Sequence, residues 1–186
     1  MNTELDQKLC SKYPKMFRDR HAPMTETAMC WGFECGDGWY NIIDQLCGNI
    51  QHHIDWREKN NQSDLDYNLM IAEANNGNMA PIEQYYKGWL SAESYIQESI
   101  KKGPRDVRPD ITQVIVTQVK EKFGTLRFYY DGGDDVIDGM VRMAEAMSAV
   151  TGEECGVPGE QRQGGWIRTL CDEHEAAYQA RFQGDQ

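Results

Sequence analysis

The residues best suited to chemistry lie near the C-terminal end of the sequence. Cys155 is followed by a glycine, as in half of a zinc knuckle, where the glycine lets backbone amides turn toward the thiolate. Cys171 and His174 form a Cys-x-x-His pair that can chelate one ion from a single turn. A structural zinc site needs four nitrogen or sulfur ligands, and Gly152 stands where the fourth is expected. The pattern predicts a zinc-ribbon-like element with three ligands: Cys155, Cys171 and His174.

Two interpretations of these three residues stay open. In the first they bind zinc, and Glu153, Cys35 or a water completes the site, because three protein ligands alone describe an open coordination sphere. In the second the element is a metal-free remnant, held by the packing of Trp166, Ile167 and Leu170. Both interpretations predict that the two sulfurs and the imidazole converge in space.

The other groups of ligand-type residues have simpler explanations. Four acids lie where a helix is predicted to begin, and they suit an N-cap and first-turn positions better than a magnesium or calcium site: Asp131, Asp134, Asp135 and Asp138. His52 and His53 are adjacent on a predicted helix and point about 100° apart, so they do not chelate one ion together. The sequence contains no nucleophile elbow, no His-Glu-x-x-His and no phosphate-binding glycine loop.

Aromatic residues outnumber those that the predicted elements need for a core. Aromatic side chains outside a core are typical anchors of binding surfaces, so core and binding roles are both open for this set. If the chain binds a small ligand, the candidate contacts are Arg127, Arg168 and Trp166. The surplus comprises Trp31, Phe33, Trp39, Tyr85, Tyr86, Trp89, Phe128, Tyr129 and Tyr130.

Hydrophobic periodicity predicts three helices. Apolar residues spaced three and four apart mark residues 38–58, 82–101 and 135–150 as helical, with Asp37 as the expected N-cap of the first. A weaker helical stretch lies around 65–74. The apolar stripe of the third helix consists of Val136, Met140, Met143, Met147 and Val150.

One antiparallel hairpin is predicted between the second and third helices. β-Branched residues from position 111 onward give way, after a Lys-Phe-Gly turn, to an aromatic run that ends at 130. Gly124 is expected to adopt a positive φ in this turn. The predicted fold class is therefore α+β: a small antiparallel sheet over 111–130 packed by three or four helices.

The predicted organisation is one α+β domain over residues 1–150 with a C-terminal element packed on it. Residues 58–80 look loop-rich, because polar and turn-forming residues interrupt the apolar pattern there. Residues 151–186 hold the zinc-ribbon-like hairpin and a terminal helix from Glu173 to Phe182.

Charge and composition exclude several classes of function. The formal net charge is −11, from 30 acidic and 19 basic residues, with no basic cluster, so binding to nucleic acid or to an anionic membrane is disfavoured. No apolar run approaches the roughly 18 residues of a membrane span, and the N-terminus lacks the pattern of a secretory signal. Because no secretory signal is recognised, the six cysteines are expected to be thiols, some of them metal ligands, rather than disulfides.

Three segments resemble a known family. Residues 35–39 (Cys-Gly-Asp-Gly-Trp), 122–129 (Lys-Phe-Gly-Thr-Leu-Arg-Phe-Tyr) and 165–174 (Gly-Trp-Ile-Arg-Thr-Leu-Cys-Asp-Glu-His) are similar to a family of small uncharacterised proteins of tailed phages and prophages. Members typically carry Cys-x-x-Cys before the Gly-Trp segment, so Gly152 is a departure. The resemblance implies a phage origin and expression in the bacterial host cytoplasm, and it supplies no reaction.

The leading functional hypothesis is a non-enzymatic phage accessory protein that binds and modulates a host protein, in host takeover or counter-defence. The acidic charge of the chain, its surplus of aromatic residues and its lack of catalytic motifs favour this hypothesis. A module that binds a small ligand such as a nucleotide signal is the first alternative. A metal-dependent enzyme with an open coordination position at Cys155, Cys171 and His174 is the second.

Overall fold

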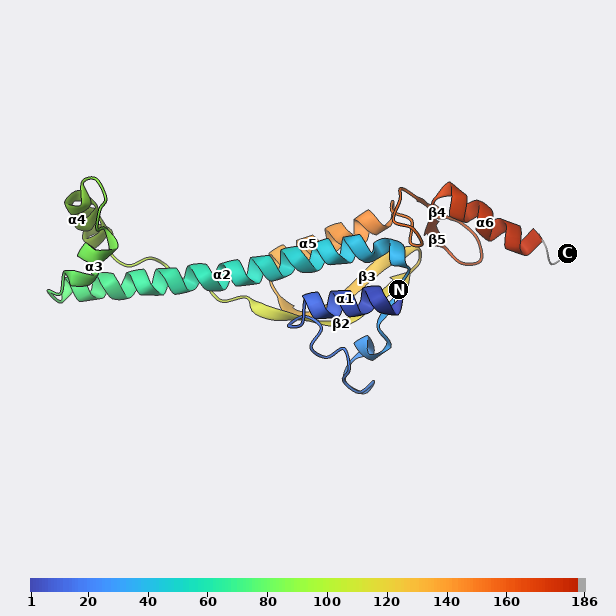
Figure 1. Cartoon of the computed structure of the whole chain (residues 1–186), viewed down its shortest axis with the longest axis horizontal. Coiled ribbons are helices and arrows are strands. Elements are labelled where there is room, and N and C mark those ends of the chain that lie inside the picture. Colours follow the sequence, from blue (N-terminus) through green and yellow to red (C-terminus); the bar gives the residue numbers. More distant parts are fainter. Residues whose placement is uncertain (184–186) are drawn as a thin grey trace. The chain divides into compact units, whose positions relative to one another are not determined.

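The computed structural model describes residues 1–183, and its fold is α+β as predicted (Figure 1). No helix in this range is long and apolar enough to cross a bilayer. Two short 3-10 helices, η1 (Ala28–Trp31) and η2 (Asp37–Trp39), precede the longest helix. The α-helices are α1 (Thr3–Lys12), α2 (Tyr40–Asn75), α3 (Ala80–Tyr85), α4 (Ala92–Lys102), α5 (Asp135–Ser148) and α6 (Asp172–Gln183). The strands are β1 (Phe33–Glu34), β2 (Thr112–Lys122), β3 (Thr125–Gly133), β4 (Glu160–Arg162) and β5 (Arg168–Leu170).

Two compact units make up the chain. The first consists of Met1–Ile54 together with Ile111–Gln186, and the second is Asp55–Asp110. The C-terminal segment after residue 150 thus belongs to the same unit as the sheet. Residues 55–110 form a unit of their own, which the sequence analysis did not separate.

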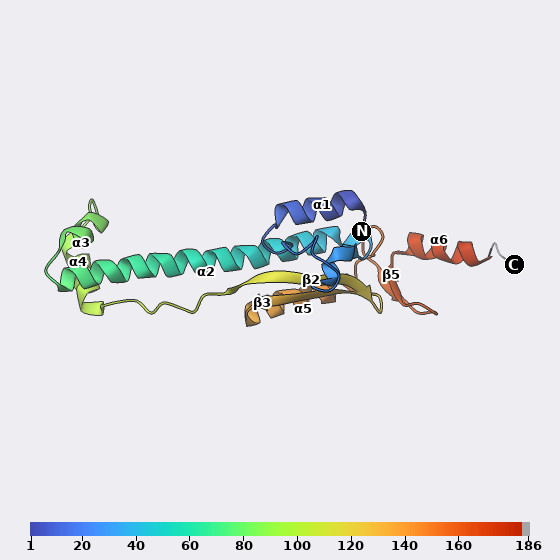
Figure 2. The same cartoon turned by 90° about the horizontal axis from the view of Figure 1, so that it is seen from below.

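The sheet of the first unit is built on the predicted hairpin (Figure 2). β2 and β3 pair antiparallel, and the closing pair Lys122–Thr125 leaves Phe123 and Gly124 as a two-residue turn. Both turn residues have positive φ, 56° and 75°, which is the backbone that matches the twist of the flanking strands. The prediction for Gly124 is confirmed. The short strand β1 adds parallel to β2, with Phe33 opposite Val119, so the three-stranded sheet is mixed.

The core of the first unit joins α1, the first half of α2, the sheet and α5. Trp39, Ile43 and Ile50 are fully buried, and they contribute to one cluster with the inward-facing residues of the hairpin, among them Leu126 and Phe128. α5 lies alongside the first half of α2 (Figure 1). Its buried face is Ile137, Val141, Ala144 and Ser148. The stripe that periodicity singled out on this helix is instead mostly exposed.

The prediction that residues 58–80 are loop-rich is wrong, because α2 runs without a break to Asn75. Its polar residues are satisfied inside the second unit. Asn61 is buried, and its side-chain amide donates to the Arg108 carbonyl at 2.8 Å and to an Asp110 carboxylate oxygen at 2.6 Å. A polar stretch that reads as a linker in sequence is therefore a helical face docked on another segment.

The single helix predicted over 82–101 is also wrong, because the chain forms α3 and α4 with a break at residues 86–91. Gly88 (φ 85°) and Ser91 (φ 62°) take left-handed backbone there, which a helix does not tolerate. Tyr86 stabilises the break: its buried hydroxyl lies 2.7 Å from that of Ser99 on α4.

Candidate metal centre

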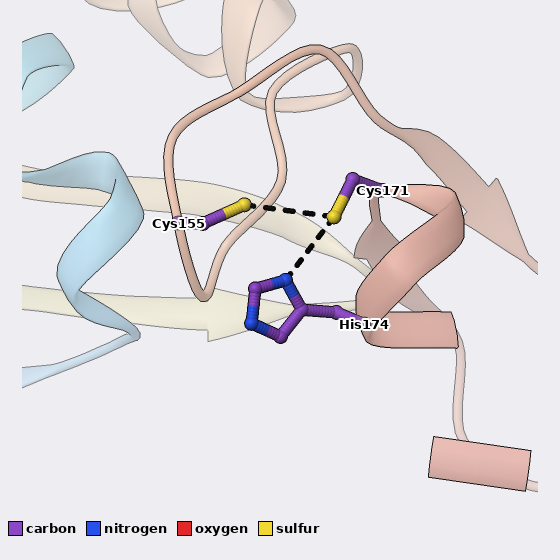
Figure 3. Close-up of side chains that lie close together, drawn as sticks. All are labelled: Cys155, Cys171 and His174. Atoms are coloured by element: carbon purple, nitrogen blue, oxygen red, sulfur yellow. Dashed lines mark hydrogen bonds between the residues drawn. The ribbon is translucent and has the colours of Figure 1, made fainter. Parts of the chain in front are cut away.

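The three predicted ligands converge at one point of the first unit (Figure 3). The Cys155 and Cys171 sulfurs are 3.6 Å apart, and the Cys171 sulfur is 3.1 Å from Nδ1 of His174. One ligand atom from each residue lies within 4.8 Å of the others, so the group could hold a metal ion. The prediction of convergence is confirmed.

Cys155 is placed by a tight loop that closes on itself. The Gly152 amide donates to the Val157 carbonyl at 2.8 Å, and the Gly156 amide donates to the Gly152 carbonyl at 2.7 Å. Gly156 has a φ of 74°, which its missing side chain permits. We call residues 151–158 the knuckle loop; an isolated bridge between Thr151 and Pro158 closes it.

The Gly-Asp-Gly-Trp segment, residues 36–39, packs against the knuckle loop, and we call it the seat of this loop. The Gly38 amide donates to the Glu153 carbonyl at 2.8 Å, and the Trp39 indole donates to the Thr151 carbonyl at 2.8 Å. A Cβ at Gly38 would lie 2.3 Å from the Gly152 carbonyl oxygen. Two backbone segments more than a hundred residues apart therefore touch directly, and only glycine permits it. No local pattern in the sequence indicates this role of the segment.

Asp37 is not the N-cap of α2, because it is the first residue of the 3-10 helix η2, which precedes α2. Its carboxylate accepts hydrogen bonds from the backbone amide and the side-chain amide of Asn2, both at 2.7 Å. Asp37 thus ties the seat of the knuckle loop to the start of α1 rather than starting the helix that follows it.

The turn of the main hairpin supports the same site from another side. Thr169 on β5 is fully buried, and its hydroxyl donates to the Gly124 carbonyl. The Thr169 carbonyl in turn accepts the Glu153 amide at 2.9 Å. A Cβ at Gly124 would lie 3.0 Å from a methyl group of Ile167. The three segments that carry the family resemblance thus meet around the metal-ligating group.

Cys171 and His174 lie at the start of a helix. Cys171 directly precedes α6, and its carbonyl accepts the Glu175 amide at 2.9 Å. In a ribbon both ligand pairs lie on knuckles; here the β4–β5 hairpin connects a knuckle loop to a helix N-terminus. The amides at such a terminus favour a negative charge, so they suit a thiolate ligand.

Electrostatics at the group favour a thiolate on Cys171. The His174 backbone amide, and then the His174 side chain, lower the pKa of the Cys171 thiol from 9.0 to about 7. The same contact with Cys171 raises the pKa of His174 above 6.5. Burial raises the pKa of Cys155 above 9.0. Of the two thiols of this group, Cys171 is therefore the one that ionises more readily at neutral pH.

Two of the three fourth ligands considered from sequence lie outside the group. A Glu153 carboxylate oxygen accepts the Gly36 amide at 2.9 Å, and burial raises the pKa of this carboxyl. Cys35 is buried, and burial raises the pKa of its thiol to about 12. Neither residue joins the three ligands in the part of the chain that the structure describes. A water is the remaining candidate.

Of the three residues proposed from sequence to contact a small ligand, the structure brings only two together. Trp166 and Arg168 line a cavity of about 430 Å³ next to α6, and the Arg168 guanidinium lies 4.9 Å from the centroid of the Tyr178 ring. Arg127 does not line this cavity. Its guanidinium donates to the Thr125 hydroxyl at 2.6 Å and to the Leu126 carbonyl at 2.7 Å.

The acidic cluster has the structural role expected of it. Asp134 is the N-cap of α5, where its side chain accepts the Ile137 amide at 3.1 Å, and its other oxygen lies 3.0 Å from Nε2 of His53. The Asp138 carboxylate accepts the hydroxyl of Tyr130. These contacts leave no grouping of the four acids around a common point within residues 1–183.

Comparison with family models, curated proteins and solved structures finds no match to this chain.

Proposed function

We propose that the chain is a non-enzymatic phage accessory protein that binds and modulates a host protein in the bacterial cytoplasm. In this proposal Cys155, Cys171 and His174 bind a zinc ion that fastens the C-terminal segment. The single observation that carries the binding role is a cluster of exposed aromatic and apolar side chains in the second unit.

The chemistry of the three ligands favours zinc over the harder cations. Thiolate and imidazole are ligands of zinc, whereas magnesium and calcium prefer oxygen. The ion would join the knuckle loop to the start of α6, two segments that are sixteen residues apart along the chain at Cys155 and Cys171. We assign it a structural role, because it lies where a small hairpin and a helix end need to be held together.

The exposed cluster of the second unit lies around the break between α3 and α4. Trp89 is 54% exposed and Leu90 is 93% exposed. The Trp89 ring is held in place by edge contacts with Tyr86 and Tyr95, at centroid distances of 5.3 and 5.5 Å. Exposed aromatic side chains that are already ordered lose little conformational entropy on binding, and this makes them effective interface anchors.

Capture from a bacterial host lysate tests this role. The wild-type chain is expected to retain a specific host protein, and Trp89→Ala together with Leu90→Ser is expected to abolish that retention. Trp31→Ala is the matched control, because Trp31 is similarly exposed, at 59%, but lies in the first unit. If the double variant retains the same protein as the wild type, or if no protein is retained, the proposed role of the cluster is wrong.

Metal analysis tests the zinc assignment separately. The purified chain is expected to carry one zinc ion, and Cys171→Ser is expected to lose it. A wild-type chain that takes up no zinc after reduction and incubation with excess zinc would contradict the assignment.

Binding of a small anionic ligand is the second candidate function, because the cavity beside α6 combines aromatic side chains with a cationic side chain held in place. Trp166 and Tyr178 provide stacking surfaces, and Arg168 provides the charge. Native mass spectrometry of the purified chain tests this role. A retained ligand that is lost in Arg168→Ala would support it, and a ligand-free spectrum in the presence of added nucleotides would exclude it.

A further inference from the structure

Helix α5 is apolar on two sides, and only one of them is buried in the core. The inner face packs against the hairpin through Ile137, Val141, Ala144 and Ser148. The outer stripe consists of Val136, Met140, Met143, Met147 and the following Val150. Met140 is partly buried, while Met143 and Val150 are 66% and 63% exposed.

The spacing of the outer stripe suits contact with another helix. Its members follow one another at intervals of four, three, four and three residues, the spacing that keeps one seam of a helix against a partner helix. Its three methionines line a groove of about 560 Å³ between α5 and the start of α2. Methionine side chains adapt their shape to a partner, so this surface can pack closely without a preformed pocket. The groove is lined by Asn41, Ile42, Gln45, Leu46, Asn49, Met140, Met143, Ala144 and Met147.

This surface lacks charge in a strongly charged protein. A quarter of all residues are charged and the net charge is −11, yet no charged residue lines the groove or belongs to the outer stripe. Of the charged residues of α5, helical geometry places Asp138 and Glu145 on the side away from the stripe, whereas Asp135 and Arg142 flank its edge. A basic partner would find no complementary acid here. A second copy of the chain would meet an equally neutral surface, which keeps the two net negative charges from facing each other directly.

The order of residues in the stripe also points to a second copy. Read in either direction it is Val, Met, Met, Met, Val, with Met143 at the centre. A two-fold axis through Met143 brings Val136 opposite Val150 of the second copy, and Met140 opposite Ala146. Gly139, at the edge of the stripe, lies opposite Met147 of the second copy in this arrangement. A Cβ at Gly139 would have no atom within 4 Å, so the edge leaves room for close approach.

We propose that two copies of the chain associate through α5, antiparallel, about a two-fold axis at Met143. Self-complementary surfaces of this kind are what a two-fold dimer requires, because each residue and its counterpart exchange places across the axis. The proposal is independent of the metal centre and of the aromatic cluster, which involve neither the stripe nor the groove.

Analytical ultracentrifugation of the full chain tests the dimer. From low micromolar to submillimolar concentration, the wild type is expected to reach a mass twice the 21.4 kDa of one chain. Met143→Glu places two like charges at the axis and is expected to leave only monomer, with an unchanged circular dichroism spectrum because the side chain is exposed. Met24→Glu, at a methionine that is 68% exposed elsewhere, is expected to remain dimeric. A monomeric wild type, a dimer unaffected by Met143→Glu, or a foreign polypeptide bound at α5 overturns the proposal.

A charge-pair experiment tests the antiparallel register. Val136→Glu alone and Val150→Lys alone are each expected to weaken the dimer at least tenfold, because each buries an unpaired charge. The chain that carries both substitutions is expected to recover most of the affinity, since each glutamate then faces a lysine of the other copy. If the double variant is weaker than either single variant, the two copies do not associate in this register.

Discussion

Replacement of Gly152 by cysteine is the sharpest test of the metal centre. A Cβ at this position would lie 3.4 Å from the Cys155 sulfur, 3.3 Å from the Val157 carbonyl oxygen and 3.4 Å from the Cys171 amide nitrogen. These are close but tolerable contacts, and Gly152 is not among the residues with positive φ. Gly152→Cys therefore adds a thiol within reach of the three existing ligands and forces little rearrangement of the knuckle loop.

The expected gain in zinc affinity follows from the binding free energy that one ligand contributes. Structural zinc in small zinc-finger peptides is bound with about 10–16 kcal/mol, which is about 2.5–4 kcal/mol for each of four ligands. That range corresponds to about 60- to 700-fold in the dissociation constant. Because the Val157 carbonyl must yield slightly, we expect about 100-fold tighter binding for Gly152→Cys.

Competition with a chromophoric zinc chelator measures this difference. The assay uses the reduced full-length chain at neutral pH, with Gly152→Ser as the matched control, because serine has nearly the same volume but is a poor zinc ligand. Gly152→Ser is expected to bind zinc like the wild type or slightly more weakly. If Gly152→Cys binds less than about tenfold tighter than Gly152→Ser, the knuckle loop does not present position 152 to the ion and the reasoning fails.

Three further predictions test the surroundings of this site. In the metal-free chain, the rate at which iodoacetamide alkylates Cys171 should rise with pH around the pKa of about 7, because only the thiolate reacts. His174→Ala should move the midpoint of this rise upward but keep it below 9.0, since the backbone donor remains. A midpoint at 9.0 in the wild type would contradict the geometry. Gly38→Ala should lower the free energy of unfolding by about 2 kcal/mol or more in a denaturant titration, because its Cβ would lie 2.3 Å from a knuckle-loop carbonyl oxygen. Gly164→Ala, with no atom within 4 Å of its Cβ, should change it by no more than about 0.5 kcal/mol, and equal effects of the two would argue against the seat. Phe123→Asn should stabilise the chain by about 1 kcal/mol, because Phe123 holds a φ of 56° that asparagine adopts more readily; a loss of stability would count against the two-residue turn.

The parts of the fold that sequence predicted well are those whose pattern is local. The hairpin, its turn at Gly124 and helix α5 follow from alternation, turn chemistry and capping within short stretches of chain. The convergence of Cys155, Cys171 and His174 was also predictable, because the spacing of Cys171 and His174 allows both to face one ion from a single turn and the glycine after Cys155 marks a tight loop. The errors in the second unit have the opposite origin. Asn61 looks like a linker residue until Arg108 and Asp110 accept its hydrogen bonds.

The amino-acid sequence by itself determined the fold class, the hairpin and the three residues that could hold a metal ion. Only the tertiary structure decided which apolar face of α5 enters the core, because both faces satisfy helical periodicity and burial is settled by the neighbouring hairpin. It also decided the role of Gly38. Gly38 lets the knuckle loop, more than a hundred residues away in the sequence, approach its backbone. No local sequence pattern predicts this role, because the contact that requires glycine forms only when the chain is folded.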